Sequence, residues 1–120
     1  MTEPTLLIVD DHDGFRAMAR ALLESSGFVV VGEASSGEDA LVAARALQPD
    51  IVLLDVVLPG IDGFAVCDLL AGENRPPAVV LTSSRDASAY RTRLRSTFAR
   101  GFIGKHDLTG AALTAILHPS

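Results

Sequence analysis

Hydrophobic residues along the chain fall into five short runs separated by longer amphipathic segments. The runs have the length of strands and lie at Leu6–Val9, Phe28–Gly32, Ile51–Leu54, Ala78–Leu81 and Gly101–Gly104. The middle runs, Ile51–Leu54 and Ala78–Leu81, are apolar at every position. This is typical of strands in a parallel sheet that is covered by helices on both faces. The pattern therefore predicts five strands.

The segments between these runs have the spacing of helices. Gly27 follows the first segment as a C-terminal stop. Ser35 and Glu38 have capping-box spacing at the start of the second, and Pro49 ends it. Asp62 is the expected cap of the third. The predicted apolar faces of the first two helices are Phe15, Met18, Ala19, Leu22, Leu23 and Ala40, Leu41, Ala44, Leu47, and the other three helices are expected at Phe64–Leu70, Ala87–Thr97 and Thr109–Leu117.

Strands that alternate with helices over the whole length predict βα units joined by right-handed crossovers. We therefore expect an α/β fold, a doubly wound (βα)5 three-layer sandwich with a five-stranded parallel sheet in the flavodoxin-like order 2-1-3-4-5. The 120 residues have room for one domain, 1–120, with an ordered core over about 5–118.

Composition narrows the class of protein. With 48% hydrophobic and 21% charged residues, the chain is expected to be globular, and its apolar runs stop after four residues, far short of a membrane span. A net charge of −5 disfavours direct binding to nucleic acid. Without a recognisable signal segment, we expect a cytoplasmic protein. The single cysteine, Cys67, is expected in the core.

Chemistry-bearing residues follow the predicted strands. Asp10 and Asp11 follow the first strand, Asp55 the third, Thr82 the fourth and Lys105 the fifth. The carboxyl ends of parallel strands meet at one edge, where sites of such folds lie. Three clustered carboxylates favour a hard cation, Mg²⁺, and an aspartate can accept a phosphoryl group. Each residue alone reads as a helix cap, a turn residue or a surface charge, but the combination favours a phosphoryl site.

The sequence resembles the receiver domain of two-component response regulators, a family with the fold of the chemotaxis regulators, over essentially its whole length. The resemblance implies a phosphorylation-activated switch, not a turnover enzyme, whose donor is a sensor histidine kinase or a phosphotransfer protein. It implies Mg²⁺ as cofactor, with Asp11 favoured over Asp10 as the direct ligand. The motifs that carry it are Leu7–His12, Asp55–Gly63, Val80–Ser83 and Gly101–Lys105. The implied roles are Asp55 as phosphoacceptor, Asp10, Asp11, Asp55 and the Val57 backbone carbonyl as metal ligands, and Thr82, Phe102 and Lys105 as switch and phosphate-binding residues.

Three positions depart from the family pattern. His106 stands where proline often follows the lysine, which argues against a cis peptide bond there and is closer to regulators with helix-turn-helix outputs. Phe98 replaces a glycine that commonly ends the fourth helix, so the end of that helix is expected to be altered. Ser83 adds a hydroxyl beside Thr82, and Val57 and Ser84 occupy positions that tune hydrolysis in the family.

Partners and rival functions follow from the same residues. Arginines around Arg91 and Arg95 point either to a solvated face or to a homodimer surface made by the fourth helix, fifth strand and fifth helix. A homodimer through the first and fifth helices is the alternative. An output domain, transcriptional in kind, is expected to follow this chain. A receiver-like interaction module without phosphorylation stays open. A Mg²⁺-dependent aspartyl phosphatase is less favoured, because its late acidic pair is replaced by Lys105.

Overall fold

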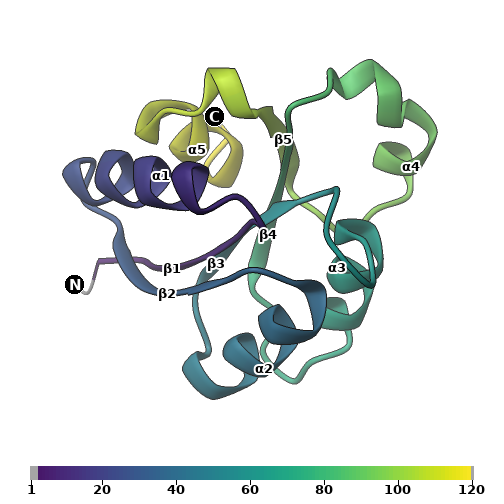
Figure 1. Ribbon diagram of the computed structural model, residues 1–120, viewed down its shortest axis with the longest axis horizontal. Coiled ribbons are helices and arrows are strands. Elements are labelled where there is room, and N and C mark those ends of the chain that lie inside the picture. The colour runs from purple at the N-terminus through teal and green to yellow at the C-terminus, as the bar shows by residue number, and fades with distance from the viewer. Residues whose placement is uncertain (1–2, 120) are drawn as a thin grey trace.

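The computed structural model describes residues 3–119 and contains one five-stranded sheet with helices on both faces (Figure 1). The strand order is β2-β1-β3-β4-β5, and every pairing is parallel. The predicted fold class and strand order are therefore confirmed. The elements are β1 (Thr5–Val9), α1 (Asp13–Ser25), β2 (Val29–Ala34), α2 (Gly37–Leu47), β3 (Ile51–Asp55), α3 (Gly63–Ala71), β4 (Ala78–Ser83), α4 (Arg91–Arg95), β5 (Gly101–Gly104) and α5 (Gly110–Leu117), with 3-10 turns at Ala87–Tyr90 and Lys105–Asp107.

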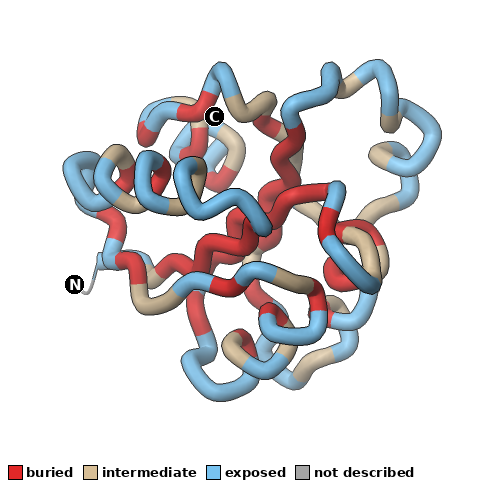
Figure 2. Tube along the Cα trace, in the orientation of Figure 1, coloured by how far each residue is buried: buried red, intermediate tan, exposed pale blue. Residues whose placement is uncertain are grey.

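Two hydrophobic cores lie on opposite faces of the sheet, because alternate strand residues point to opposite sides. Leu7 and Leu54 belong to the core packed by α2 and α3. Ile8 and Leu53 belong to the core packed by α1 and α5. Figure 2 shows the buried residues concentrated along the central strands. The sheet is thereby packed by helices on both faces.

Local signals place several element boundaries. Asp62 caps α3 by accepting a hydrogen bond from the Ala65 N–H, and Thr109 caps α5 by accepting one from the Ala112 N–H. The cap of α2 is Ser36, which accepts from the Asp39 N–H, and not Ser35. The second strand begins at Val29 and continues to Ala34, because it pairs with β1 as far as Val9.

The predicted fourth helix, Ala87–Thr97, is wrong in extent. Its first turn, Ala87–Tyr90, is a 3-10 turn, and the α-helix covers only Arg91–Arg95. Ser96 ends it, and Phe98 lies in the following loop with 44% of its surface exposed. Two residues assigned to apolar helix faces are also exposed, since Met18 on α1 and Leu47 on α2 each expose 44%.

Other expectations agree with the structure. Cys67 is fully buried in α3. The peptide bond between Lys105 and His106 is trans, as are all others among the described residues. No helix within residues 3–119 has both the length and the apolar character needed to cross a bilayer.

Candidate functional site

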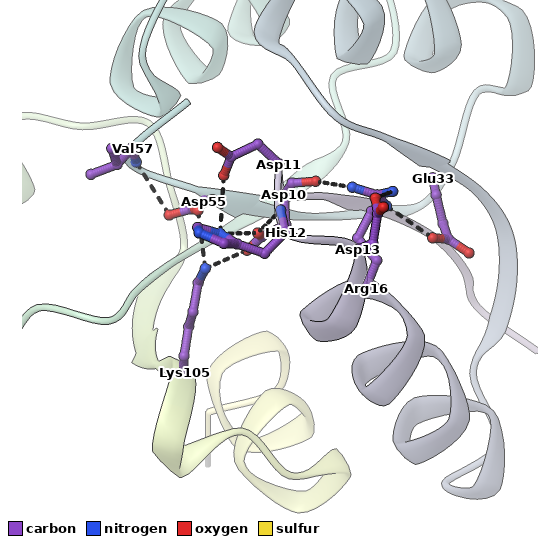
Figure 3. A network of polar contacts seen from close by, with 9 residues as sticks. All are labelled: Asp10, Asp11, His12, Asp13, Arg16, Glu33, Asp55, Val57 and Lys105. Atoms are coloured by element: carbon purple, nitrogen blue, oxygen red, sulfur yellow. Dashed lines mark hydrogen bonds and ion pairs between the residues drawn. The ribbon is translucent and has the colours of Figure 1, made fainter. Parts of the chain in front are cut away.

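The carboxyl edge of the sheet gathers three charged side chains into direct contact (Figure 3). The Lys105 Nζ lies 2.7 Å from Asp10 Oδ2 and 3.1 Å from Asp55 Oδ2. Both carboxylates are almost completely buried. The lysine follows β5, Asp10 follows β1 and Asp55 ends β3, so the pairing of β1, β3, β4 and β5 is needed to assemble this cluster.

Asp10 is fixed by the loop that leads into α1. The His12 backbone N–H donates to Asp10 Oδ1 at 2.9 Å, and the His12 Nδ1 lies 3.1 Å from the same oxygen. That nitrogen is also 3.1 Å from Asp11 Oδ1. Asp11 is partly exposed and His12 is 70% exposed at its side chain, so the cluster opens to solvent on this side.

Asp55 ends β3 in a buried position, where it is repelled by the charge of Asp10 and attracted by that of Lys105. Its Oδ1 accepts a hydrogen bond from the Val57 N–H at 3.2 Å. Burial, followed by repulsion from Asp10, raises the pKa of Asp55 from 3.8 to about 6, although Lys105 acts in the opposite direction. An ionised Asp55 therefore gains more than an ordinary surface carboxylate from any additional positive charge nearby.

Lys105 is the positively charged residue that pairs with Asp10 and Asp55. Burial disfavours the charged ammonium, but the hydrogen bonds to Asp10 and Asp55 outweigh it and raise the pKa of Lys105. Its Nζ also lies 4.7 Å from the centre of the Phe15 ring. The lysine is thus charged, immobilised between two carboxylates and only slightly exposed.

The acidic residues are close enough to hold one cation. Ligand atoms of Asp10, Asp11, His12 and Asp55 all lie within 4.8 Å of one another. Three of the four groups are carboxylates, the oxygen donors that Mg²⁺ takes, usually together with water and phosphate oxygens. A divalent cation would also relieve the repulsion that raises the pKa of Asp55. The donor set therefore fits Mg²⁺. The sequence analysis did not identify His12 as a residue of this cluster.

Thr82 lies beside Asp55, since the two are register partners on β4 and β3. The Thr82 hydroxyl is fully buried and has no hydrogen-bond partner among the described residues. A buried hydroxyl without a partner is costly, which is consistent with a residue whose partner arrives with a ligand. Phe102 on β5 is half-buried and packs against the core that contains Leu81.

The three expected tuning residues lie in different surroundings. The Val57 side chain is exposed, with 57% of the residue accessible beside Asp55. Ser83 is buried, and its hydroxyl is 2.9 Å from the Tyr90 hydroxyl. Ser84 is exposed in the loop after β4. The contact between Ser83 and Tyr90 was not predicted, because it joins residues seven positions apart across a loop of irregular structure.

Arg16 is a second residue that the sequence analysis missed. Its guanidinium donates to the Asp10 carbonyl at 2.6 Å and to Glu33 Oε1 at 3.1 Å, and it also pairs with Asp13 (Figure 3). Arg16 lies one helical turn after the start of α1, so it can reach back over the loop that carries Asp10. The position of Arg16 in the first turn of the helix, six residues after Asp10, was the feature of the sequence that could have predicted this contact.

Comparison with known proteins relates the whole domain to one family. Residues 6–117 match the family model described as the response regulator receiver domain. The chain is 40% identical over 101 residues to the response regulator GacA of Pseudomonas aeruginosa, which covers 83% of this chain and 47% of GacA. It is 36% identical over 102 residues to BvgA of Bordetella pertussis, whose name describes a positive transcription regulator of virulence factors, covering 85% and 49% of the two chains. The chain therefore spans about half the length of these relatives.

A solved structure supports the same relationship. The signal receiver domain of the response regulator NarL from Mycobacterium tuberculosis superposes with a TM-score of 0.84 at 33% sequence identity, and the match covers 98% of both chains. The similarity therefore extends from the strand order to the full set of elements.

Proposed function

The chain belongs to the response regulator receiver domain family, and from this membership we propose that it is a phosphorylation-activated switch in which Asp55 accepts a phosphoryl group. The observation that carries the proposal is the contact of a buried Asp55 with Lys105 beside a second carboxylate, Asp10. Such a group is shielded, partly neutralised and located at the edge of the sheet where ligands bind.

In the proposed reaction, an Asp55 carboxylate oxygen attacks phosphorus. The new O–P bond forms as the P–N bond of a phosphohistidine donor breaks, and the leaving imidazole keeps the electron pair and takes a proton. The product is an acyl phosphate. Lys105 would neutralise a phosphoryl oxygen as a point charge, because its Nζ is already 3.1 Å from Asp55 Oδ2.

Asp10, Asp11, Asp55 and the Val57 backbone carbonyl are the proposed ligands of Mg²⁺. When bound, the cation would neutralise charge on the phosphoryl oxygens and orient them. The residues of the chain do the remaining work. The Val57 N–H holds one Asp55 oxygen at 3.2 Å and so helps to fix the orientation of the carboxylate, which limits the freedom of the attacking group.

The proposed conformational response to phosphorylation of Asp55 is a change in position of Thr82 and Phe102. A phosphoryl group on Asp55 offers acceptor oxygens to the unpartnered Thr82 hydroxyl. Movement of Thr82 leaves space on the side of the sheet where Phe102 packs, and we propose that Phe102 turns inward to fill it. The surface formed by α4, β5 and α5 then changes shape.

The proposed partners are those of a regulatory domain. The donor is a sensor histidine kinase or a phosphotransfer protein. We propose that residues 1–120 are a single receiver domain and that the full-length protein also has a transcriptional output domain; the relatives BvgA and GacA are about twice as long as the stretch that matches this chain. A homodimer through α4, β5 and α5 would use the exposed Arg91 and Arg95, which form no ion pair within residues 3–119.

Intact-mass measurement tests this function. The protein is incubated with Mg²⁺ and acetyl phosphate, beside Asp55→Asn and a sample with EDTA. We expect one added phosphoryl group in the first sample and none in the other two. If the wild-type protein gains no phosphoryl group and also fails to bind beryllium fluoride, the proposal is wrong and the interaction-only function replaces it.

A further inference from the structure

We propose that Tyr90 is a latch that ties the loop after β4 to the end of that strand and opposes the movement of Thr82. Tyr90 ends the 3-10 turn Ala87–Tyr90 that leads into α4. The inference rests on the proposed switch function and adds a positioning residue to it. Its expected effect is on the equilibrium between the two positions of the switch, because the hydrogen bond and ring contacts of Tyr90 among the described residues are with Ser83, Phe64 and Phe102 and not with Asp55.

The latch is a partly buried hydrogen bond whose Ser83 end is buried. The Ser83 Oγ and the Tyr90 Oη lie 2.9 Å apart, and either hydroxyl can donate. The Ser83 Oγ also accepts a hydrogen bond from the Arg85 N–H at 3.1 Å. Since Ser83 is 1% exposed, water does not readily replace Tyr90 as its partner. Breaking this bond therefore has a larger effect than breaking an exposed one.

The Tyr90 ring joins α3 and β5 to this hydrogen bond. Its centroid lies 5.9 Å from that of Phe64 on α3 and 6.0 Å from that of Phe102 on β5. A second tether holds the same segment, because Arg93 pairs with Asp62 at 3.1 Å and lies 4.1 Å above the Phe64 ring. The α4 helix has only five residues, so these side chains and not its own backbone bonds fix its position.

The Ser83–Tyr90 bond connects directly to the switch. Ser83 follows Thr82 in the chain, so a movement of Thr82 toward Asp55 displaces the Ser83 hydroxyl as well. A displacement of about 1 Å carries a 2.9 Å hydrogen bond beyond bonding distance. An inward rotation of Phe102 also changes its contact with the Tyr90 ring. The bond therefore belongs to the arrangement of the unmodified protein and must break when the switch operates.

The surroundings of Tyr90 can be followed directly by a labelled tyrosine, because the chain contains only this one tyrosine. Protein made with 3-fluorotyrosine carries its fluorine label at Tyr90 alone, so the protein gives one fluorine NMR signal, separate from the signals of beryllium fluoride. We would compare wild type, Ser83→Ala and Ser88→Ala with and without Mg²⁺ and beryllium fluoride, a non-covalent phosphoryl analogue. Ser88 is the matched control, since it lies in the same turn, is exposed and has no side-chain hydrogen bond among the described residues.

Beryllium fluoride is expected to shift the Tyr90 signal of wild type and Ser88→Ala. Ser83→Ala is expected to move the signal toward the liganded position before any ligand is added. The latch is overturned if the chemical shift of Tyr90 in Ser83→Ala equals that of wild type, or if bound beryllium fluoride leaves the wild-type shift unchanged.

Affinity gives a second readout that a purely structural role would not produce. Dissociation constants for beryllium fluoride, measured by calorimetry with saturating Mg²⁺, are expected to fall about two- to tenfold in both Ser83→Ala and Tyr90→Phe. The double variant is expected to match the single ones, because one bond is lost in all three. Additive effects would show that the two residues act independently and would overturn the latch. Weaker binding in either variant would also contradict the proposal.

Intact mass of the same samples separates the two proposals. If wild type gains no phosphoryl group from acetyl phosphate and binds no beryllium fluoride, the switch function fails and the latch fails with it. If wild type gains the phosphoryl group or binds the analogue while the Tyr90 readouts stay unchanged, only the latch is wrong.

Discussion

The Lys105 ammonium lies 3.1 Å from Asp55 Oδ2, although β4 separates the two strands that lead to these residues. Lys105→Met would leave Asp10 and Asp55 buried without their cation. We expect the free energy of unfolding in EDTA at pH 7.5 to fall by about 3 kcal/mol. Urea denaturation followed by circular dichroism measures it. Arg91→Met, at an exposed arginine, is the control and should change stability by less than about 0.5 kcal/mol. Equal stability of wild type and Lys105→Met would contradict the role of Lys105 in neutralising the buried carboxylates.

The raised pKa of Asp55 predicts how the stability of the metal-free protein depends on pH. A carboxyl whose pKa rises from 3.8 to about 6 on folding stabilises the fold while it is protonated. This contribution is fully present below pH 4 and is lost as the pH rises through 6. In EDTA, wild type should therefore lose on the order of 2 kcal/mol relative to Asp55→Asn between pH 4 and pH 7. Parallel stability curves for the two proteins would show that the pKa is ordinary.

Gly63 predicts a steric effect on the site. A Cβ atom at this position would overlap the Asp55 carbonyl oxygen and lie 2.8 Å from the Val56 Cα. We expect Gly63→Ala to destabilise the fold by about 1–3 kcal/mol and to slow the phosphorylation of Asp55. Gly14→Ala is the matched control with the opposite sign, because Gly14 is helical and has open space around it. Both are measured by thermal unfolding, and equal midpoints would refute the close packing.

Asp62 combines a helix cap with an ion pair. Burial favours the neutral acid, but the Ala65 N–H and Arg93 outweigh it and lower the pKa of Asp62. Its contribution to stability is therefore present above the unfolded pKa and is lost as the pH falls through the folded value. Asp62→Ala should cost about 1 kcal/mol at pH 7 and little at pH 2.5. Asp62→Asn keeps a capping group, so a loss as large as that of Asp62→Ala would assign the effect to Arg93.

The proposed dimer surface predicts a charge effect on association. Arg95 is exposed and has no ion pair within residues 3–119. With Mg²⁺ and beryllium fluoride present, Arg95→Glu should weaken self-association several-fold in sedimentation velocity. Arg75→Glu, an exposed arginine between α3 and β4, is the control. Association that is untouched by Arg95→Glu would place the interface elsewhere.

The sequence contains enough information for the sheet because its strands are apolar runs at regular intervals. The residues at the strand ends are also readable, since a strand that ends at Asp55 positions that aspartate without reference to distant residues. The cap of α2 was misplaced because Ser35 and Ser36 each precede an acidic residue by three positions. The backbone conformation at Ser36 decides between them, and local pattern does not encode it.

The fourth helix and its contacts were not predictable in the same way. Helical spacing over residues 87–97 is satisfied by both a 3-10 turn and an α-helix. The choice depends on what Tyr90 reaches, and its partners Ser83, Phe64 and Phe102 come from three other elements. The Arg16 contact with Glu33 is similar, because it exists only once α1 and β2 lie side by side.

The position of Lys105 late in the chain has a consequence for the order of folding. β1, β2 and β3 are adjacent in the sheet and lie within the first 55 residues, so Asp10 and Asp55 can meet during synthesis before Lys105 exists. An early three-stranded intermediate would bury two like charges without a counterion. Addition of β5 removes this penalty by bringing in the ammonium. The electrostatics of the site therefore disfavour a stable half-folded chain and favour cooperative completion of the sheet.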